Sequence, residues 1–202
     1  MIAIIDYNVG NLYNLKNALD YQGLQSRIVR HPAGLAAASH IILPGVGAFG
    51  PAMDHLRQAG METVVRERVA AGVPFLGVCV GMQLLFDRSD EDGLHQGLGL
   101  VPGRVVRFRG ELKVPQIGWN QVAWQHADPL SEGIPDDTYF YFVHSYHAVL
   151  HERGDALGLT EYGESFPSVV RHGNVWGAQF HPEKSQNAGL RLLKNFAALR
   201  PE

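Results

Sequence analysis

The sequence predicts an α/β protein built on an open, mixed and largely parallel sheet with helices on both faces. Apolar strand-like segments alternate with helix-like segments in the first half of the 202-residue chain, which is typical of parallel strands joined by covering helices. The second half holds short strand-like segments with few helices between them, which indicates hairpins and a mixed sheet. We expect one domain over residues 1–202, because the sequence contains no linker, repeat or low-complexity tract.

Composition narrows the class of protein. Hydrophobic residues make up 46% of the chain and charged residues 18%, as in ordinary globular proteins. The net charge of −3 and the absence of a Lys/Arg cluster argue against a nucleic-acid binder. The apolar start of the chain is too short for a signal peptide, because an acidic residue already follows at position 6. The longest apolar stretch, 73–86, is broken by Pro74, two glycines and Gln83. We therefore expect no contact with a membrane.

A single cysteine, Cys79, is present. It excludes a disulfide within the chain and a multi-cysteine metal site. The reducing cytoplasm is the expected setting.

Strands and helices of the first half follow from hydrophobic spacing. Leu12, Leu15, Ala18 and Leu19 recur at helical intervals, and Gly23 is suited to end that helix. The expected strands are 2–6, 25–30, 40–43 and the segment that starts at Phe75, and the expected helices are 11–21, 51–59 and 62–71.

Six further strands and one helix are expected in the second half. The last helix, 188–199, directs Leu192, Leu193, Phe196 and Leu199 inward. The expected strands are 104–108, 120–124, 138–149, 157–161, 168–171 and 175–181.

The segment 75–83 has the layout of a nucleophile elbow. An apolar strand ends at Cys79, a helix-like segment follows, and Gly77 and Gly81 stand where a side chain would crowd the sharp turn. A lone cysteine outside such a setting is more often a small buried hydrophobic residue. The glycine flanks favour the nucleophile.

A cysteine nucleophile needs a base and a group that orients the base. Pro182 disfavours a helical conformation at His181, and residues two apart in extended chain face the same way. The Glu183 carboxylate can then hold the His181 ring, as acidic groups do in catalytic triads. We expect His181 to end the strand 175–181. The alternative is a plain surface turn.

The glycine-rich loop 44–47 follows the strand 40–43. It can be a simple tight turn or a phosphate cradle, although it lacks both phosphate-binding glycine signatures. It can also be an oxyanion hole, in which the backbone N–H groups of Gly45, Val46 and Gly47 act together with that of Val80, the residue after the nucleophile.

Other polar and aromatic residues carry weaker signals. His144 and His147 are three apart on an expected strand and so point to opposite faces, which argues against a shared metal ion. Trp119 is compatible with core packing, and Asn11 and Asn14 with capping or solvating a helix.

Together these stretches resemble the class I glutamine amidotransferase family. The resemblance runs nearly end to end, through residues 6–14, 43–50, 77–83, 118–120, 142–146 and 179–185. One departure is Val80, where leucine is more usual. Since the backbone N–H is the working group there, we expect little effect.

The resemblance implies a flavodoxin-like three-layer fold and the hydrolysis of L-glutamine to glutamate and ammonia, without a cofactor or metal. Cys79, His181 and Glu183 match the catalytic triad, and the reaction passes through a glutamyl thioester. The family's glutamine-holding elements correspond to Gln83, His144, Ser145 and Tyr146.

The resemblance also implies a partner. Residues 118–120 and 184–185 favour the branch that delivers ammonia to a (β/α)8-barrel cyclase, which makes imidazole glycerol phosphate and AICAR in histidine biosynthesis. The expected assembly is a cytoplasmic heterodimer, and the positions that match its interface are Asn11, Asn14, Trp119, Tyr141 and Lys184.

Three other functions stay open at this point. The chain can be the glutaminase of another pathway, such as anthranilate or pyridoxal phosphate synthesis. It can also be a non-catalytic subunit that regulates the barrel. A cysteine hydrolase acting on γ-glutamyl peptides is a weaker possibility.

Overall fold

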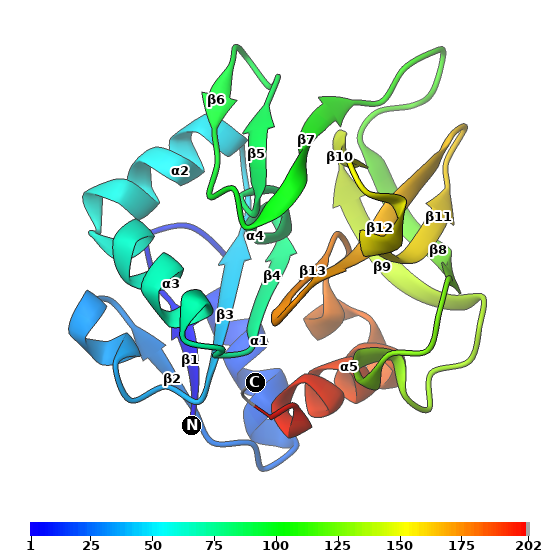
Figure 1. The fold of residues 1–202 in the computed structure, drawn as a ribbon. Coiled ribbons are helices and arrows are strands. Elements are labelled where there is room, and N and C mark those ends of the chain that lie inside the picture. The colour runs from blue at the N-terminus through cyan, green and yellow to red at the C-terminus, as the bar shows by residue number, and fades with distance from the viewer. Residues whose placement is uncertain (201–202) are drawn as a thin grey trace.

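The computed structural model describes residues 1–200 and is organised around a nine-stranded mixed sheet (Figure 1). The strands lie in the order β2 (Ser26–Val29), β1 (Ile2–Ile5), β3 (His40–Gly45), β4 (Phe75–Cys79), β13 (Val175–Ala178), β12 (Ser165–His172), β11 (Ala156–Glu161), β8 (Gln116–Trp124) and β9 (Thr138–His144). Pairing is parallel from β2 to β13 and antiparallel from β13 to β9. The predicted fold class is confirmed.

Five α-helices accompany this sheet within residues 1–200. They are α1 (Leu12–Tyr21), α2 (Phe49–Gln58), α3 (Met61–Ala70), the single turn α4 (Val80–Gln83) and α5 (Gln186–Ala198). Helices α2 and α3 cover one face of the parallel half, and α1 and α5 lie on the other (Figure 1). Short 3-10 helices occupy Pro32–Leu35, Pro129–Ser131, Arg153–Asp155 and Pro182–Lys184.

The helices form where apolar spacing predicts them, within about three residues at each end. Leu15 and Leu19 of α1 are fully buried, and Gly23 follows the helix with a φ of 70° that suits glycine. In α5 the side chains of Leu192, Leu193 and Phe196 are buried as predicted, whereas Leu199 follows the end of the helix and is only partly buried. No helix among residues 1–200 is both long and apolar enough to cross a membrane.

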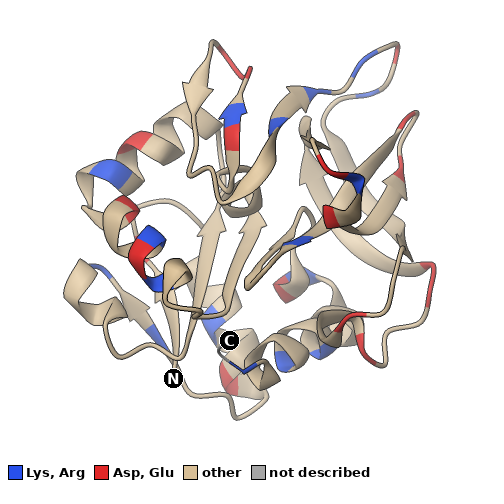
Figure 2. Ribbon diagram, in the orientation of Figure 1, with Lys and Arg blue, Asp and Glu red and all other residues tan. Residues whose placement is uncertain are grey.

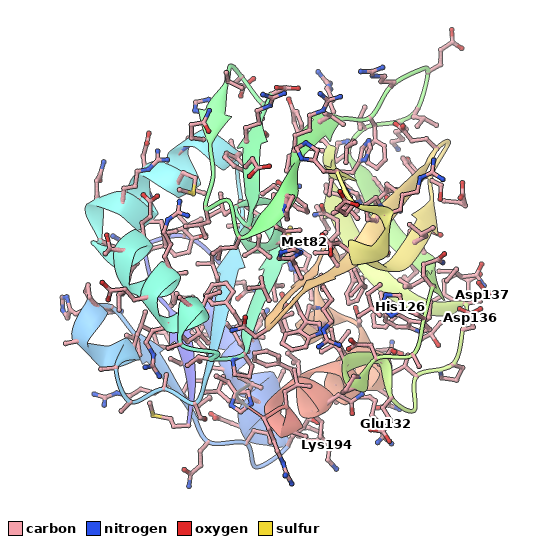
Figure 3. The ribbon with its side chains drawn as sticks, viewed as in Figure 1. Met82, His126, Glu132, Asp136, Asp137 and Lys194 are labelled. Carbon is pink, nitrogen blue, oxygen red and sulfur yellow. The ribbon has the colours of Figure 1, made fainter. Side chains whose placement is uncertain are left out.

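Strands β3 and β4 form the centre of the core. Every residue of both strands is buried, and Figure 2 shows both arrows free of Lys, Arg, Asp and Glu. Strands covered on both faces are uniformly apolar for this reason. Figure 3 places Met82 at the centre of the molecule, whereas His126, Glu132, Asp136 and Lys194 lie at its periphery.

A second sheet was not predicted. It has the order β10 (Tyr146–Leu150), β7 (Val101–Arg107), β5 (Phe86–Ser89) and β6 (His95–Gln96). The expected single strand 138–149 is wrong, because the chain leaves the large sheet at Ser145 and enters the small one at Tyr146. The carbonyl of Ser145 accepts a hydrogen bond from the Phe108 N–H at 3.2 Å.

Two other expected boundaries also differ. Strand β13 ends at Ala178, three residues before His181. Strand β3 continues through Gly45 and α2 begins at Phe49, so the glycine-rich loop is shorter than predicted. The predicted domain end at residue 202 lies outside the described residues.

Candidate active site

Cys79 lies on a strained turn between β4 and α4. Its backbone has φ 55° and ψ −116°, a left-handed φ that a residue with a side chain rarely adopts. A Cβ on Gly77 would lie 2.5 Å from the carbonyl oxygen of Gly81, and a Cβ on Gly81 would overlap the carbonyl oxygen of Leu43. The flanking glycines are therefore required by close backbone contacts, as the elbow motif predicts.

His181 and Glu183 meet through the turn that follows β13. The His181 Nδ1 atom lies 2.9 Å from Glu183 Oε1, and the two side chains are 6% and 3% exposed. His181 has the extended backbone expected before a proline. The prediction that it ends a strand is wrong, and Glu183 reaches the ring from a 3-10 turn rather than from extended chain.

The backbone around His181 is held by its neighbours. Its N–H donates to the Tyr141 carbonyl at 2.9 Å, and its own carbonyl accepts from the Ser185 hydroxyl at 2.6 Å. The Tyr141 N–H in turn donates to Ser185 Oγ at 3.0 Å. These bonds tie the turn to β9 and fix where the imidazole lies.

His181 also interacts with Cys79. Burial by itself would lower the pKa of His181, but hydrogen bonds to Cys79 and Glu183, together with their charges, raise it to about 10. Since Nδ1 faces Glu183, the Nε2 side of the ring faces the sulfur. The ring therefore carries its proton at neutral pH and is placed to transfer it beside Cys79.

A cavity of about 300 Å³ opens above the sulfur. It brings together many of the residues singled out from sequence: Val46, Gly47, Cys79, Val80, Gln83, His144, Ser145, Tyr146, His181 and Lys184. Gly45 and Glu183 instead line a much smaller void of about 10 Å³ behind the imidazole, together with Asn11.

The glycine-rich loop reaches the sulfur from β3. Gly45 is paired with Cys79 across β3 and β4, and a Cβ on Gly45 would lie 2.6 Å from the Gly81 nitrogen. Val46 is 41% exposed, and Gly47 has a φ of 87°. Strand pairing and the close approach of Gly45 to Gly81 thus place the start of this loop beside the elbow that carries Cys79.

Gln83 lines the cavity together with Ser145 and Tyr146, where the chain passes from β9 in the large sheet to β10 in the small one (the strand crossing). The Gln83 Nε2 group donates to the Tyr146 carbonyl at 3.0 Å and to Gln179 Oε1 at 3.1 Å. Both amide hydrogens are then used, so only the Gln83 carbonyl oxygen is available to a bound molecule, as an acceptor.

His144 directly precedes this strand crossing. Burial lowers its pKa to about 4, so the ring is neutral and has one N–H. Its Nδ1 lies 2.8 Å from the Tyr146 carbonyl and its Nε2 lies 2.9 Å from the Gln116 amide. The Gln116 atom at this distance is Oε1, so both ring nitrogens face oxygen acceptors, and the single N–H of the neutral ring donates to one of them.

His144 and His147 lie on different strands, β9 and β10, on either side of Ser145. His147 lies on β10, where its ring stacks on Phe108 with centroids 4.7 Å apart, and it does not line the cavity. Within residues 1–200, no group of three or more His, Cys, Asp or Glu side chains could hold a metal ion.

Glu91 was missed from sequence and lines the cavity. Burial raises its pKa, although a hydrogen bond of 2.7 Å from the Phe49 N–H to its Oε2 acts in the opposite direction. Its carboxylate can accept hydrogen bonds from an ammonium group. An acidic run between β5 and β6 is typical of a solvated turn, so the sequence carried no signal for this position.

Of the residues that matched the interface, Lys184 lines the cavity and Asn11 lines the smaller void beside His181 and Glu183. Trp119 on β8 is 46% exposed and meets Tyr141 on β9 edge to face, with centroids 5.9 Å apart. Lys184 Nζ lies 5.8 Å from the centre of the Tyr141 ring. Asn11 precedes α1, and Asn14 is exposed on its first turn.

Known proteins resemble this chain over nearly its whole length. Residues 3–199 match the family model for glutamine amidotransferase class-I. A relative from Desulfitobacterium hafniense strain Y51 is 50% identical, covering 97% of this chain and 93% of the relative. One from Sulfurimonas denitrificans is 48% identical, covering 99% of each. Both are named imidazole glycerol phosphate synthase subunit HisH.

Solved structures share the fold at low sequence identity. A crystal structure described as a glutamine amidotransferase has a TM-score of 0.74 at 24% identity, covering 98% of this chain and all of the other. The structure of PurLQS from Thermotoga maritima has a TM-score of 0.76 at 15% identity and covers 96% of each chain.

The raised pKa of His181 gives a measurable pH dependence. We expect the ring to stay protonated from pH 6.5 to about pH 10. Its contribution to the free energy of unfolding is fully present below pH 6.5 and is lost as the pH rises through 10. Histidine-labelled NMR follows the titration, with His144 as an internal control that stays neutral above about pH 4.

Two variants test the cause of this shift. Glu183→Gln and Cys79→Ala each remove a partner that favours the charged ring, so each lowers the pKa of His181. A His181 titration at or below pH 6.5 in the unmodified protein would contradict the assigned geometry.

Proposed function

The chain belongs to the class I glutamine amidotransferase family and groups with the HisH subunits of imidazole glycerol phosphate synthase; on that premise we propose that it hydrolyses L-glutamine at Cys79. The observation that carries this proposal is the buried imidazole of His181, which stands between Glu183 and the sulfur of a strained elbow. We further propose that residues 1–202 act as one glutaminase domain.

The first half of the reaction forms a thioester. Cys79 Sγ attacks the side-chain carbonyl carbon of glutamine, and a tetrahedral oxyanion forms. The backbone N–H groups of Gly45, Val46 and Gly47, with that of Val80, would stabilise this charge. His181 gives its proton to the amide nitrogen, which leaves as ammonia, and a glutamyl thioester stays on Cys79.

The second half returns the enzyme to its starting state. His181, now neutral, takes a proton from water while the water oxygen attacks the thioester carbonyl. The C–S bond breaks, glutamate leaves, and the sulfur and the ring again share the imidazolium proton. Glu183 keeps the ring in one orientation and stabilises its charged form in both halves.

Glutamine would lie in the cavity above the sulfur. Its volume of about 300 Å³ is at the lower end of the range of small-molecule sites. Gln83 offers a carbonyl oxygen, and Ser145 and Tyr146 supply the strand crossing against which the substrate lies. Glu91 is the carboxylate that would face the substrate's α-ammonium group.

The HisH names of the relatives imply a partner subunit in imidazole glycerol phosphate synthase. We propose that this partner is a (β/α)8-barrel cyclase that receives the ammonia and makes imidazole glycerol phosphate and AICAR. Free ammonia in water becomes ammonium, which has no lone pair for attack. Closing the site against the partner would prevent that loss.

The docking surface proposed for this partner lies on the exposed face of β8 and β9. Ile117 is 64% exposed, Trp119 46% and Tyr139 54%, and exposed apolar side chains grouped on one face mark interaction sites. Val143 on the same face and Lys184 beside it line the cavity mouth. A partner that covers Trp119, Tyr141 and Lys184 would therefore also cover the site.

A substitution at the nucleophile tests the proposed chemistry. In the complex with its cyclase partner, Cys79→Ala removes the atom that attacks glutamine, so glutamine-dependent synthesis is expected to fall to background. Synthesis from added ammonium salts should persist, because the partner does not need the thiol. Product formation under both conditions is the measurement. Continued turnover with glutamine would mean that Cys79 is not the nucleophile.

A second substitution tests the docking surface. Trp119→Ala removes a large exposed aromatic and is expected to weaken the affinity for the partner by about tenfold or more. Tyr21→Ala, at the far end of α1 and 82% exposed, is the matched control and should leave the affinity unchanged. Calorimetric titration measures both, and equal affinities would place the interface elsewhere.

A further inference from the structure

Tyr7 is a buried tyrosine beside the elbow that the reaction described above does not use. It is the second residue after β1, at the edge of the sheet where β3 and β4 also end, and is 1% exposed. Its hydroxyl donates a hydrogen bond of 2.8 Å to the carbonyl of Pro44. Pro44 is the second-last residue of β3, directly before Gly45 and the glycine-rich loop.

The hydroxyl lies where the loop and the elbow touch. A Cβ on Gly45 would be 2.8 Å from the Tyr7 oxygen and 2.6 Å from the Gly81 nitrogen. Gly45 is also the residue paired with Cys79. The Tyr7 oxygen is thus in contact with the backbone that leaves the sheet immediately beside the nucleophile.

The Tyr7 hydroxyl is a permanent donor. Burial raises the pKa of Tyr7, and the charge of nearby Cys79 raises it further. The phenol therefore keeps its proton throughout the working pH range. Since the Pro44 carbonyl is buried with it, loss of the hydroxyl leaves that oxygen without this partner.

The loop is held at its other end by a second side chain. The Phe49 N–H donates to Glu91 Oε2 at 2.7 Å, and Phe49 itself is fully buried. Between these ends Val46 is 41% exposed, and a Cβ on Gly47 would meet nothing within 4 Å among the described residues. The loop is therefore fixed at Pro44 and Gly45 and again at Phe49, and it is loosely packed at Val46 and Gly47 between them.

We propose that Tyr7 is a positioning residue for glutamine hydrolysis. Because the peptide bond is planar, holding the Pro44 carbonyl also fixes the direction of the Gly45 N–H. The start of the loop is then set relative to Cys79, and the N–H groups that follow are aimed at the oxyanion. This inference rests on the proposed role of Gly45 to Gly47 as oxyanion donors.

Tyr7→Phe removes only the hydroxyl oxygen and tests this role in the complex with the partner. Removing an oxyanion donor outright costs about 100- to 1000-fold in kcat, and loosening its support should cost less. We expect kcat for glutamine to fall about tenfold, with KM within about twofold, since the substrate contacts are untouched. Ammonium-dependent synthesis should not change.

Tyr162→Phe is the matched control. The Tyr162 hydroxyl also donates to a backbone carbonyl, that of Lys113, at 2.7 Å, and neither residue lines the cavity. We expect Tyr162→Phe to leave kcat unchanged. If both variants give the same kcat, the Tyr7 hydroxyl has no positioning role.

Two more measurements separate positioning from general damage. Alkylation of Cys79 by iodoacetamide forms no oxyanion, so its rate should be the same in Tyr7→Phe and the unmodified protein. A slower alkylation would show a disturbed elbow and would overturn the proposal. Replacement of Tyr7 by 3-fluorotyrosine keeps the O–H donor and should restore kcat; no recovery would also overturn it.

Failure of the proposed function gives a different result. In that case the unmodified complex shows no glutaminase activity at all. Failure of the Tyr7 inference alone leaves the unmodified complex active and Tyr7→Phe indistinguishable from the Tyr162→Phe control.

Discussion

The whole site depends on how closely three backbone segments approach one another at the carboxyl edge of the parallel strands. The carbonyl of Leu43, the elbow at Gly81 and the end of β4 at Gly77 leave no room for a Cβ. That contact holds Cys79 at a positive φ, which costs of order 1–3 kcal/mol and persists only where the surroundings enforce it. The uniformly buried strands β3 and β4 supply that enforcement.

The site also depends on the protonation states of its two buried histidines, His181 and His144. A protonated imidazole in a buried site is unfavourable unless opposite charges and hydrogen bonds compensate. His181 has such compensation from Cys79 and Glu183, and its pKa rises in spite of burial. For His144, which also lines the cavity, burial outweighs the hydrogen bond to the Tyr146 carbonyl, the only cause that favours its charged form, and the ring stays neutral. The same residue type thus has opposite protonation states at neutral pH, set by its neighbours.

The parts of the site that could be predicted from sequence are those set by local chain geometry. The glycines around Cys79 and the proline after His181 act directly on the local backbone, so these motifs can be recognised from the sequence alone. Glu91 and Tyr7 could not be found this way. Glu91 reaches the cavity only because β5 pairs with β7, and Tyr7 only because β1 pairs with β3.

In the fold, too, local features were predicted from the sequence and features that depend on distant strand pairing were not. The alternating first half was predicted in type and order, because each strand and helix has its own hydrophobic period. The break at Ser145 was missed, because residues 138–149 are rich in β-branched and aromatic residues on both sides of it. Only the pairing partners β8 and β7, distant in sequence, decide where the chain changes sheets, and the residues at that change line the cavity.

The central claim is that Cys79 is the nucleophile that attacks the side-chain carbonyl of glutamine. Incubating the assembled complex with a glutamine-analogue electrophile, followed by peptide mass mapping, tests it most directly. We expect a mass gain on the Cys79 peptide that excess glutamine prevents. No mass gain on that peptide with the partner bound, or labelling of another residue instead, would contradict it.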